Sequence, residues 1–188
     1  MKAVRFHVFG GAEQLVYEDA PEPAPGPGEV VVRVQACALN HLDLWVRKGI
    51  PAYCIQLPHI SGCDVAGIID EIGEGVEGIE IGQRVFIAPG LSCFACPDCL
   101  SGSDHLCQSY QILGAGPDGG YAEYVKAPAK NIISIPETLS FEAAAAFPLT
   151  FLTAWHMLVS RAALRPGQDL LVLGGGSGVG SAAIQIGK

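Results

Sequence analysis

The chain has little positive charge: 11 lysine and arginine residues stand against 19 aspartate and glutamate residues, for a formal net charge of −8. Binding to a phosphate backbone needs a basic surface, so this balance argues against nucleic acid as a partner. The sequence also lacks an uninterrupted apolar run of about 18 residues, which a membrane-spanning helix needs. No apolar run follows the charges near Met1, as a signal peptide would require. We therefore expect a cytoplasmic protein without membrane partners.

Apolar residues are nonetheless plentiful, at 49% of the 188 residues, which is enough for a proper core. Up to about residue 137, short runs rich in β-branched residues alternate with glycine and proline, a pattern typical of a small barrel or sandwich. A short helix is predicted over 40–48, with Gly49 ending it. Strands are predicted at 2–9, 15–19, 30–39, 60–72, 82–89, 119–126 and 131–136.

The character of the sequence changes near residue 138. A helix is expected to begin at Ser140 and run into alanines, and a second helix is expected over about 150–163, after an interruption at Pro148. The wholly apolar segment Leu170–Leu173 predicts a strand buried on both faces, as in a parallel sheet. A glycine-rich turn follows, and then a segment of helical composition.

Four of the seven cysteines fall within the short stretch 93–107. Closely spaced thiolates let one loop supply the tetrahedral shell of a zinc ion, and four thiolates leave no open position for water. The pattern therefore predicts one structural zinc per chain. Its ligands are Cys93, Cys96, Cys99 and Cys107. Four free cysteines and an iron–sulfur cluster are the alternatives, although the final gap of this pattern differs from that of bacterial ferredoxins.

The glycine-rich turn lies between a predicted strand and a predicted helix, which is the order that places a dinucleotide pyrophosphate at a helix amino terminus. The residues concerned are Gly174, Gly175, Gly176, Ser177, Gly178, Val179 and Gly180. In one register Ser177 stands where the middle glycine of G-x-G-x-x-G belongs. A tight turn without any ligand is the alternative interpretation. NAD and NADP are not distinguished by this segment.

These features together resemble the medium-chain dehydrogenase/reductase family. The resemblance is carried by Gly62-Cys63-Asp64-Val65-Ala66-Gly67 with Gly73 beyond it, by the cysteine stretch, by Gly120–Tyr124 and by Pro148–Trp155. It implies a GroES-like β-barrel domain over 1–147, with a structural zinc lobe at 91–110. It also implies that 148–188 form a connecting helix and the beginning of an incomplete, nucleotide-binding Rossmann domain.

The chain departs from the zinc-dependent members of that family where their catalytic zinc is bound. Asn40 and Leu149 stand in place of two cysteine ligands, and Cys63 in place of a histidine. Since catalytic zinc needs three protein ligands and an open position, a conventional site is not expected. The resemblance then points to the quinone-oxidoreductase-like branch. That branch transfers hydride between a nicotinamide cofactor and a small carbonyl, alcohol, quinone or enone substrate.

By position in the family, six residues are expected near the reacting groups: Asn40, His41, Asp43, Cys63, Asp64 and Thr153. Asn40 and His41 are the candidate hydrogen-bond or proton donors to a developing alkoxide or enolate. Cys63 has two interpretations. It is either a small residue packed beside the cleft or a metal ligand together with His41, His59 or Asp64.

Two other functions stay open at this point. One is a non-enzymatic GroES-like zinc module for protein interactions, and the other is a zinc-dependent alcohol dehydrogenase with an atypical catalytic site. A single parallel-type strand cannot bury itself alone. We therefore expect the isolated chain to be catalytically silent and to form a homo-oligomer through its carboxy-terminal segment.

Overall fold

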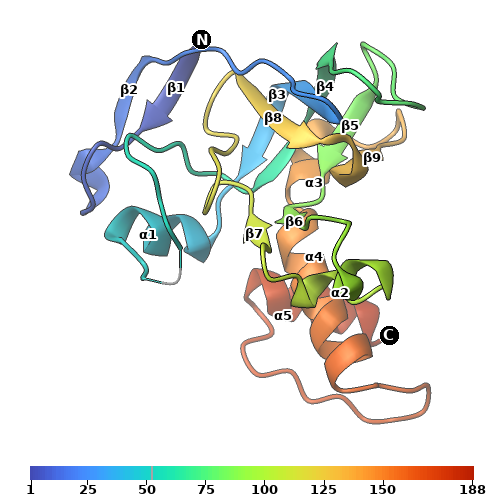
Figure 1. Ribbon diagram of the computed structural model, residues 1–188. Coiled ribbons are helices and arrows are strands. Elements are labelled where there is room, and N and C mark those ends of the chain that lie inside the picture. Colours follow the sequence, from blue (N-terminus) through green and yellow to red (C-terminus); the bar gives the residue numbers. More distant parts are fainter. Residues whose placement is uncertain (52) are drawn as a thin grey trace.

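A five-stranded antiparallel sheet forms the centre of the computed structural model, which describes residues 1–51 and 53–188 (Figure 1). Its strand order is β8-β3-β4-β5-β9, and every neighbouring pair is antiparallel. The strands are β3 (Glu29–Ala38), β4 (Asp64–Ile72), β5 (Arg84–Ile87), β8 (Tyr124–Pro128) and β9 (Ile132–Ser134). The expectation of a mostly β domain is thus confirmed for this part of the chain.

The sheet curls strongly but does not close into the predicted barrel. Its two edge strands, β8 and β9, are joined by only the three residues Ala129–Asn131. Four strand spacings of about 4.8 Å would separate the edges of a flat sheet by roughly 19 Å. The chain has only four Cα-to-Cα steps between the end of β8 at Pro128 and the start of β9 at Ile132, and these span at most about 14 Å. The short connection therefore forces curvature, yet in the described residues no ladder joins β8 to β9, so the barrel prediction is wrong in that respect.

Two smaller antiparallel pairs flank the main sheet. β1 (Lys2–Arg5) pairs with β2 (Val16–Asp19), and β6 (Gly90–Leu91) pairs with β7 (Gln111–Ile112). The second pair forms the base of a lobe that carries all four clustered cysteines. Helix α2 (Pro97–Leu100) and the 3-10 helix η2 (Asp104–Leu106) build the rest of this lobe, and another single turn, η1, covers Ala12–Gln14.

Strand β3, which lies between β8 and β4, is buried more completely than its sequence predicts. Alternation places Val30 and Val32 on the core face, and both are fully buried. Val31 is only 2% exposed, although the alternation places it on the opposite face. The register of β3 against β4 shifts between Val31 and Val32, and this irregularity interrupts the strict alternation of the two faces there.

Besides the strands, the described residues form five α-helices, α2 among them, and a π-helical turn. Helix α1 (His41–Lys48) ends, as predicted, at Gly49, whose φ of 87° is the left-handed conformation that glycine adopts without strain. Ser140 caps α3 (Phe141–Ala145), and Pro148 begins α4 (Pro148–Trp155) rather than merely interrupting it. A π-helical turn, His156–Arg161, continues α4, and α5 spans Gly178–Ile186.

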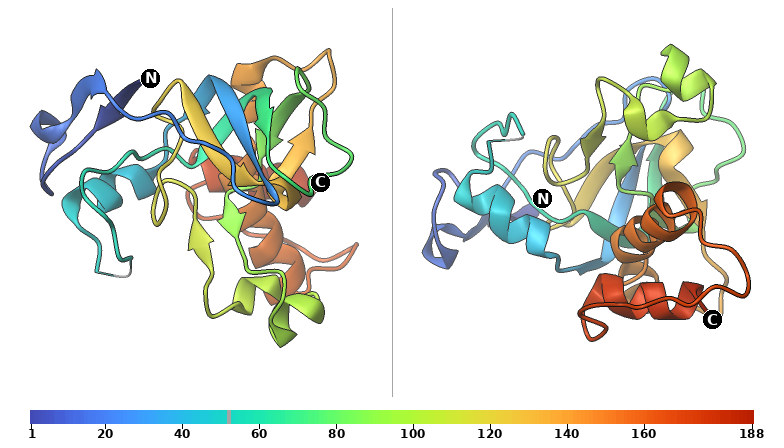
Figure 2. Two further views of the ribbon diagram at one scale, coloured as in Figure 1. Left: turned by 45° about the horizontal axis from the view of Figure 1, so that its top comes forward. Right: turned by 90° about the horizontal axis from the view of Figure 1, so that it is seen from below.

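The predicted strand Leu170–Leu173 is absent from the described residues, in which this segment is extended but unpaired. Leu171 and Leu173 are 84% and 86% exposed, whereas Leu170 and Val172 pack against the core between α4 and α5. A strand exists only where a neighbour accepts its backbone hydrogen bonds, and nothing pairs with this one. Figure 2 shows α5 crossing α4 and packed against it, away from the β1–β2 pair.

One helical segment meets the length and composition test for crossing a membrane, namely Phe141–Arg161, with a hydropathy of 1.3 and 28% of its apolar window buried. Core helices of soluble proteins meet the same test. The expected absence of a membrane partner therefore stays a prediction.

The packing of the main sheet predicts a large cost for shortening Ile69, which lies in the core of β4 and is 1% exposed. Ile69→Ala should lower the free energy of unfolding by about 2–5 kcal/mol, because it leaves a cavity among close-packed strands. Ile81→Ala serves as the control, since that side chain is 69% exposed and should cost less than about 0.5 kcal/mol. Urea titration followed by circular dichroism measures both, and equal losses would contradict the assigned core.

Candidate functional site

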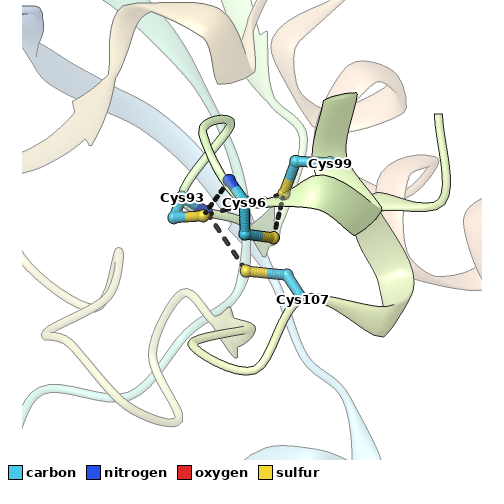
Figure 3. Close-up of side chains that lie close together, drawn as sticks. All are labelled: Cys93, Cys96, Cys99 and Cys107. Atoms are coloured by element: carbon cyan, nitrogen blue, oxygen red, sulfur yellow. Dashed lines mark hydrogen bonds between the residues drawn. The ribbon is translucent and has the colours of Figure 1, made fainter. Parts of the chain in front are cut away.

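The four clustered cysteines point their sulfur atoms at one another inside the lobe (Figure 3). All four sulfurs lie within 4.8 Å of one another, with Cys93 and Cys99 3.8 Å apart and Cys96 and Cys99 3.5 Å apart. Disulfide sulfurs lie about 2.05 Å apart, so these are separate thiols. Zinc–sulfur bonds of about 2.3 Å give a tetrahedron with edges near 3.8 Å. The arrangement has the size of a four-thiolate metal site.

Backbone amides in the same loop face the sulfur of Cys93. The amides of Ala95 and Cys96 donate to it at 3.5 and 3.3 Å. These two hydrogen bonds lower the pKa of the Cys93 thiol to about 6, since they favour the thiolate. Phe94 has a φ of 55°, and this left-handed turn aims the two amides at the sulfur.

A second group of polar residues meets where β3, β4 and α4 come together. The side-chain amide of Asn40 donates to Oδ2 of Asp64 at 3.0 Å and contacts Sγ of Cys63 at 3.4 Å. The backbone amide of Leu149 donates to Oδ1 of Asp64 at 2.8 Å. Leu149 lies in the first turn of α4, where backbone amides have no partner within the helix. Asp64 therefore supplies a negative charge to the amino terminus of α4.

Asp43 is the centre of a neighbouring network. Its carboxylate accepts hydrogen bonds from the amide of Asn40 at 2.7 Å, the amide of Gly62 at 3.1 Å and the hydroxyl of Tyr121 at 2.7 Å. Gly62 has a φ of 100°, and a Cβ there would overlap the ring of Tyr121, so only glycine fits. Burial and the bond to Asp43 raise the pKa of Tyr121 well above its usual range. Asp43 thus joins α1 to two loops.

Burial sets the ionisation of this region. Asp64 is 1% exposed, and its pKa is raised to about 6, chiefly by burial. The hydrogen bonds from Asn40 and Leu149 oppose this rise, and the charge of Asp43 adds to it. Burial also raises the pKa of the Cys63 thiol far above its usual range, and the carboxylates of Asp64 and Asp43 raise it further. Cys63 therefore stays a neutral thiol at physiological pH.

The six predicted site residues do not line one cleft. Asn40, His41 and Asp43 border a cavity of about 320 Å³. Thr153 borders a different cavity of about 610 Å³, which lies between the cysteine lobe and α4. Cys63 and Asp64 are buried behind both cavities and line neither.

Leu149 links the two sets of residues. It lines the larger cavity one helical turn before Thr153, and its backbone amide binds Asp64. The sequence identified Leu149 only as a lost metal ligand, and its amide contact carries no sequence signal beyond its place in the first turn of α4.

The second metal site considered for Cys63 has no geometric support. Across residues 1–51 and 53–188, only the lobe brings together ligand atoms of three or more histidine, cysteine or acidic residues. His59 is buried and faces the carbonyl of Gly114 at 3.0 Å. His41 is exposed beside Trp45, with the ring centres 6.1 Å apart.

The glycine-rich turn is an exposed loop that ends in a capped helix. The hydroxyl of Ser177 accepts a hydrogen bond from the amide of Gly180 at 3.0 Å, which makes Ser177 the cap of α5. This capping role explains why Ser177 stands where the middle glycine of the G-x-G-x-x-G motif belongs. A Cβ on Gly178 would press on Thr150 of α4, so this glycine lets the two helices approach closely. The turn presents free amides at the start of α5.

Comparison with known proteins identifies the family. A sequence profile of the alcohol dehydrogenase GroES-like domain matches residues 26–137, which is more than half of the chain. The chain belongs to the medium-chain dehydrogenase/reductase family. Among curated members it is 39% identical to an alcohol dehydrogenase of Geobacillus stearothermophilus and 33% identical to a quinone oxidoreductase of Lama guanicoe, each over 100% of its length. It spans 55% and 49% of these two relatives, about half of each.

Solved structures of the family agree with this assignment. A crystal structure of an NAD-dependent alcohol dehydrogenase is 55% identical, with a TM-score of 0.95, and the match covers 100% of this chain and 55% of that one. A thermostable alcohol dehydrogenase from Pyrobaculum aerophilum, solved with cobalt and zinc bound, is 37% identical with a TM-score of 0.90. That match covers 100% of this chain and 56% of the other. The resemblance predicted from sequence is confirmed, and relatives of this kind are oxidoreductases.

The raised pKa of Asp64 predicts a pH-dependent stability. Its pKa is about 6 in the folded state, against 3.8 for an ordinary aspartate. Between these values the folded protein holds a proton that the unfolded chain has lost, so this group stabilises the fold as pH falls from 7 towards 4. Asp64→Asn should therefore be more stable than the parent at pH 7.5, by on the order of 2 kcal/mol, and the difference should shrink towards pH 5.

Asp64→Asn preserves the hydrogen bonds if the side-chain amide of Asn40 rotates by half a turn. The oxygen of Asn40 then accepts a hydrogen bond from the side-chain amide nitrogen introduced at position 64. Glu77→Gln is the control, since it removes one acidic charge from an exposed side chain. Urea unfolding between pH 5 and 7.5 gives both differences. A difference for Asp64→Asn that is independent of pH would show that the carboxyl is not the titrating group.

Proposed function

We propose that this chain is the substrate-facing and cofactor-anchoring part of an NAD(P)-dependent oxidoreductase that carries a structural zinc but no catalytic zinc. Its reaction is hydride transfer to or from a small carbonyl, alcohol, quinone or enone. The observation that carries the proposal is the hydrogen-bonded contact of Asn40 and Leu149 with Asp64, since the family resemblance implies that Asn40 and Leu149 stand where zinc-dependent members have metal ligands.

The donor set around Cys63 does not suit a catalytic metal. Asn40 directs its amide nitrogen towards the Cys63 sulfur, and an amide nitrogen is a donor rather than a ligand. Leu149 offers only an aliphatic side chain at the third position. These two features favour a zinc-independent reaction over an atypical zinc-dependent alcohol dehydrogenase.

The lobe, by contrast, suits a structural zinc. Four thiols at tetrahedral spacing complete the shell, and amide donors to Cys93 offset the negative charge of the thiolates. A zinc held there would keep β6, β7 and η2 together and thereby hold one wall of the larger cavity in place. We assign it this role alone.

The Gly174–Gly180 turn would hold the cofactor pyrophosphate on the first amides of α5. A nicotinamide cofactor, when bound, supplies or accepts the hydride. The turn precedes α5, and α5 packs on α4. A cofactor held at the start of α5 would therefore be positioned relative to α4, the helix that carries Thr153. The assignment of 1–147 and 148–188 to separate domains accords with this division of roles and stays a prediction, as does the homo-oligomeric state.

Thr153 is the residue that we assign to the substrate oxygen. Its side chain borders the larger cavity, which is also lined by Tyr110, Lys130 and His156. A hydroxyl donor aimed at a developing alkoxide or enolate stabilises charge where it forms. Asn40 is fully engaged with Asp64 and Cys63, and His41 lies at the other cavity. We therefore assign the role of hydrogen-bond donor to the substrate oxygen to Thr153 rather than to Asn40 or His41. Asn40 becomes a positioning residue.

The zinc assignment predicts the metal content. Protein purified without added metal and dialysed should hold one zinc per chain, measured by elemental analysis. Cys96→Ser and Cys107→Ser should each lose it, because three thiolates bind zinc much more weakly than four. Cys54→Ser, at an exposed cysteine outside the lobe, should retain it. Iron, or no metal, would contradict the assignment.

The catalytic assignment predicts a loss of turnover at Thr153. In a version extended to the full length of the relatives, Thr153→Val should lower kcat by on the order of 100-fold, with cofactor affinity unchanged. Thr150→Val is the matched control one turn earlier, since that hydroxyl is directed at the carbonyls of Ala146 and Phe147. Turnover is followed by NAD(P)H absorbance on ketone, quinone and enone substrates, and full activity of Thr153→Val would exclude the role.

A further inference from the structure

Two histidines from distant parts of the chain meet beside the larger cavity. The ring centres of His105 and His156 lie 4.8 Å apart, with the ring planes at 57°. His105 belongs to η2 in the cysteine lobe, and His156 begins the π-helical turn after α4. Figure 1 shows the lobe beside the lower part of α4, where these elements meet. Neither ring belongs to the four-cysteine cluster.

The spacing of the rings matches that of two imidazoles sharing one metal ion. Zinc–nitrogen bonds of about 2.1 Å at adjacent coordination positions place two ring centres about 5 Å apart. The ring planes are tilted at 57° to each other.

The surroundings supply access and further oxygen atoms. His105 is exposed and His156 is partly exposed, so an ion can reach both. Asp104 and Ser160 line the same cavity of about 610 Å³, and water can complete the shell.

We propose that His105 and His156 together bind a divalent transition-metal ion of the class that imidazole prefers, with Zn²⁺ as the reference ion. This second site is separate from the four-cysteine site and weaker, since the protein supplies two ligands instead of four. A bound ion would cross-link the lobe to the helix of Thr153 and restrict the cavity between them. The proposal does not rest on hydride transfer, because the rings meet whatever reaction the cavity serves.

The test is a calorimetric titration of Zn²⁺ into the full chain that already holds one zinc equivalent. The parent should bind one further equivalent. His105→Asn and His156→Asn should each lose that equivalent while retaining the first, which also reports that the lobe is folded. His7→Asn is the matched control, since His7 is 49% exposed and contacts Glu18 of β2. Figure 1 shows β2 on the opposite side of the fold from α2 and the cysteine lobe. It should bind like the parent.

A second measurement on the parent protein needs no variant. Zn²⁺ should slow the modification of His105 and His156 by diethyl pyrocarbonate, read by peptide mass spectrometry, and leave that of His7 unchanged. No second equivalent in the parent, a second equivalent that survives both substitutions, or unchanged reactivity of the two rings would each overturn the proposal.

Discussion

The arrangement of this chain depends on one buried carboxylate. Asp64 sits at the start of β4 and is almost fully enclosed, yet each of its oxygens accepts a hydrogen bond. One bond comes from Asn40, at the junction of β3 and α1, and the other from Leu149, in the first turn of α4. Because an unpaired buried charge would be very costly, the three elements are held in the one arrangement that satisfies it.

This constraint carries through to both cavities. Leu149 is held by Asp64, and Thr153 follows one turn later on the same helix, so the carboxylate fixes the wall of the larger cavity. Asn40 is likewise held by Asp64 and by Asp43, which sets the start of α1 beside the smaller cavity. The chain ties these elements together by hydrogen bonds.

The cysteine lobe is organised by a different principle. It has little apolar core of its own, and its sulfurs are drawn together by a loop in which Phe94 adopts a left-handed conformation. The zinc that we propose there would give such a segment order that burial does not supply. The lobe and α4 enclose the larger cavity between them.

Much was readable from local pattern, because metal-ligand spacing, helix caps and turn residues act over a few positions. The four cysteines, Ser140, Gly49 and the family resemblance are of this kind. Tertiary structure alone decided what depends on distant partners. It left Leu170–Leu173 unpaired, kept the curled sheet open between β8 and β9, and separated Thr153 from Asn40 into different cavities. It also brought His105 to His156, since contacts between residues far apart in the chain follow from packing, which no short stretch of sequence encodes.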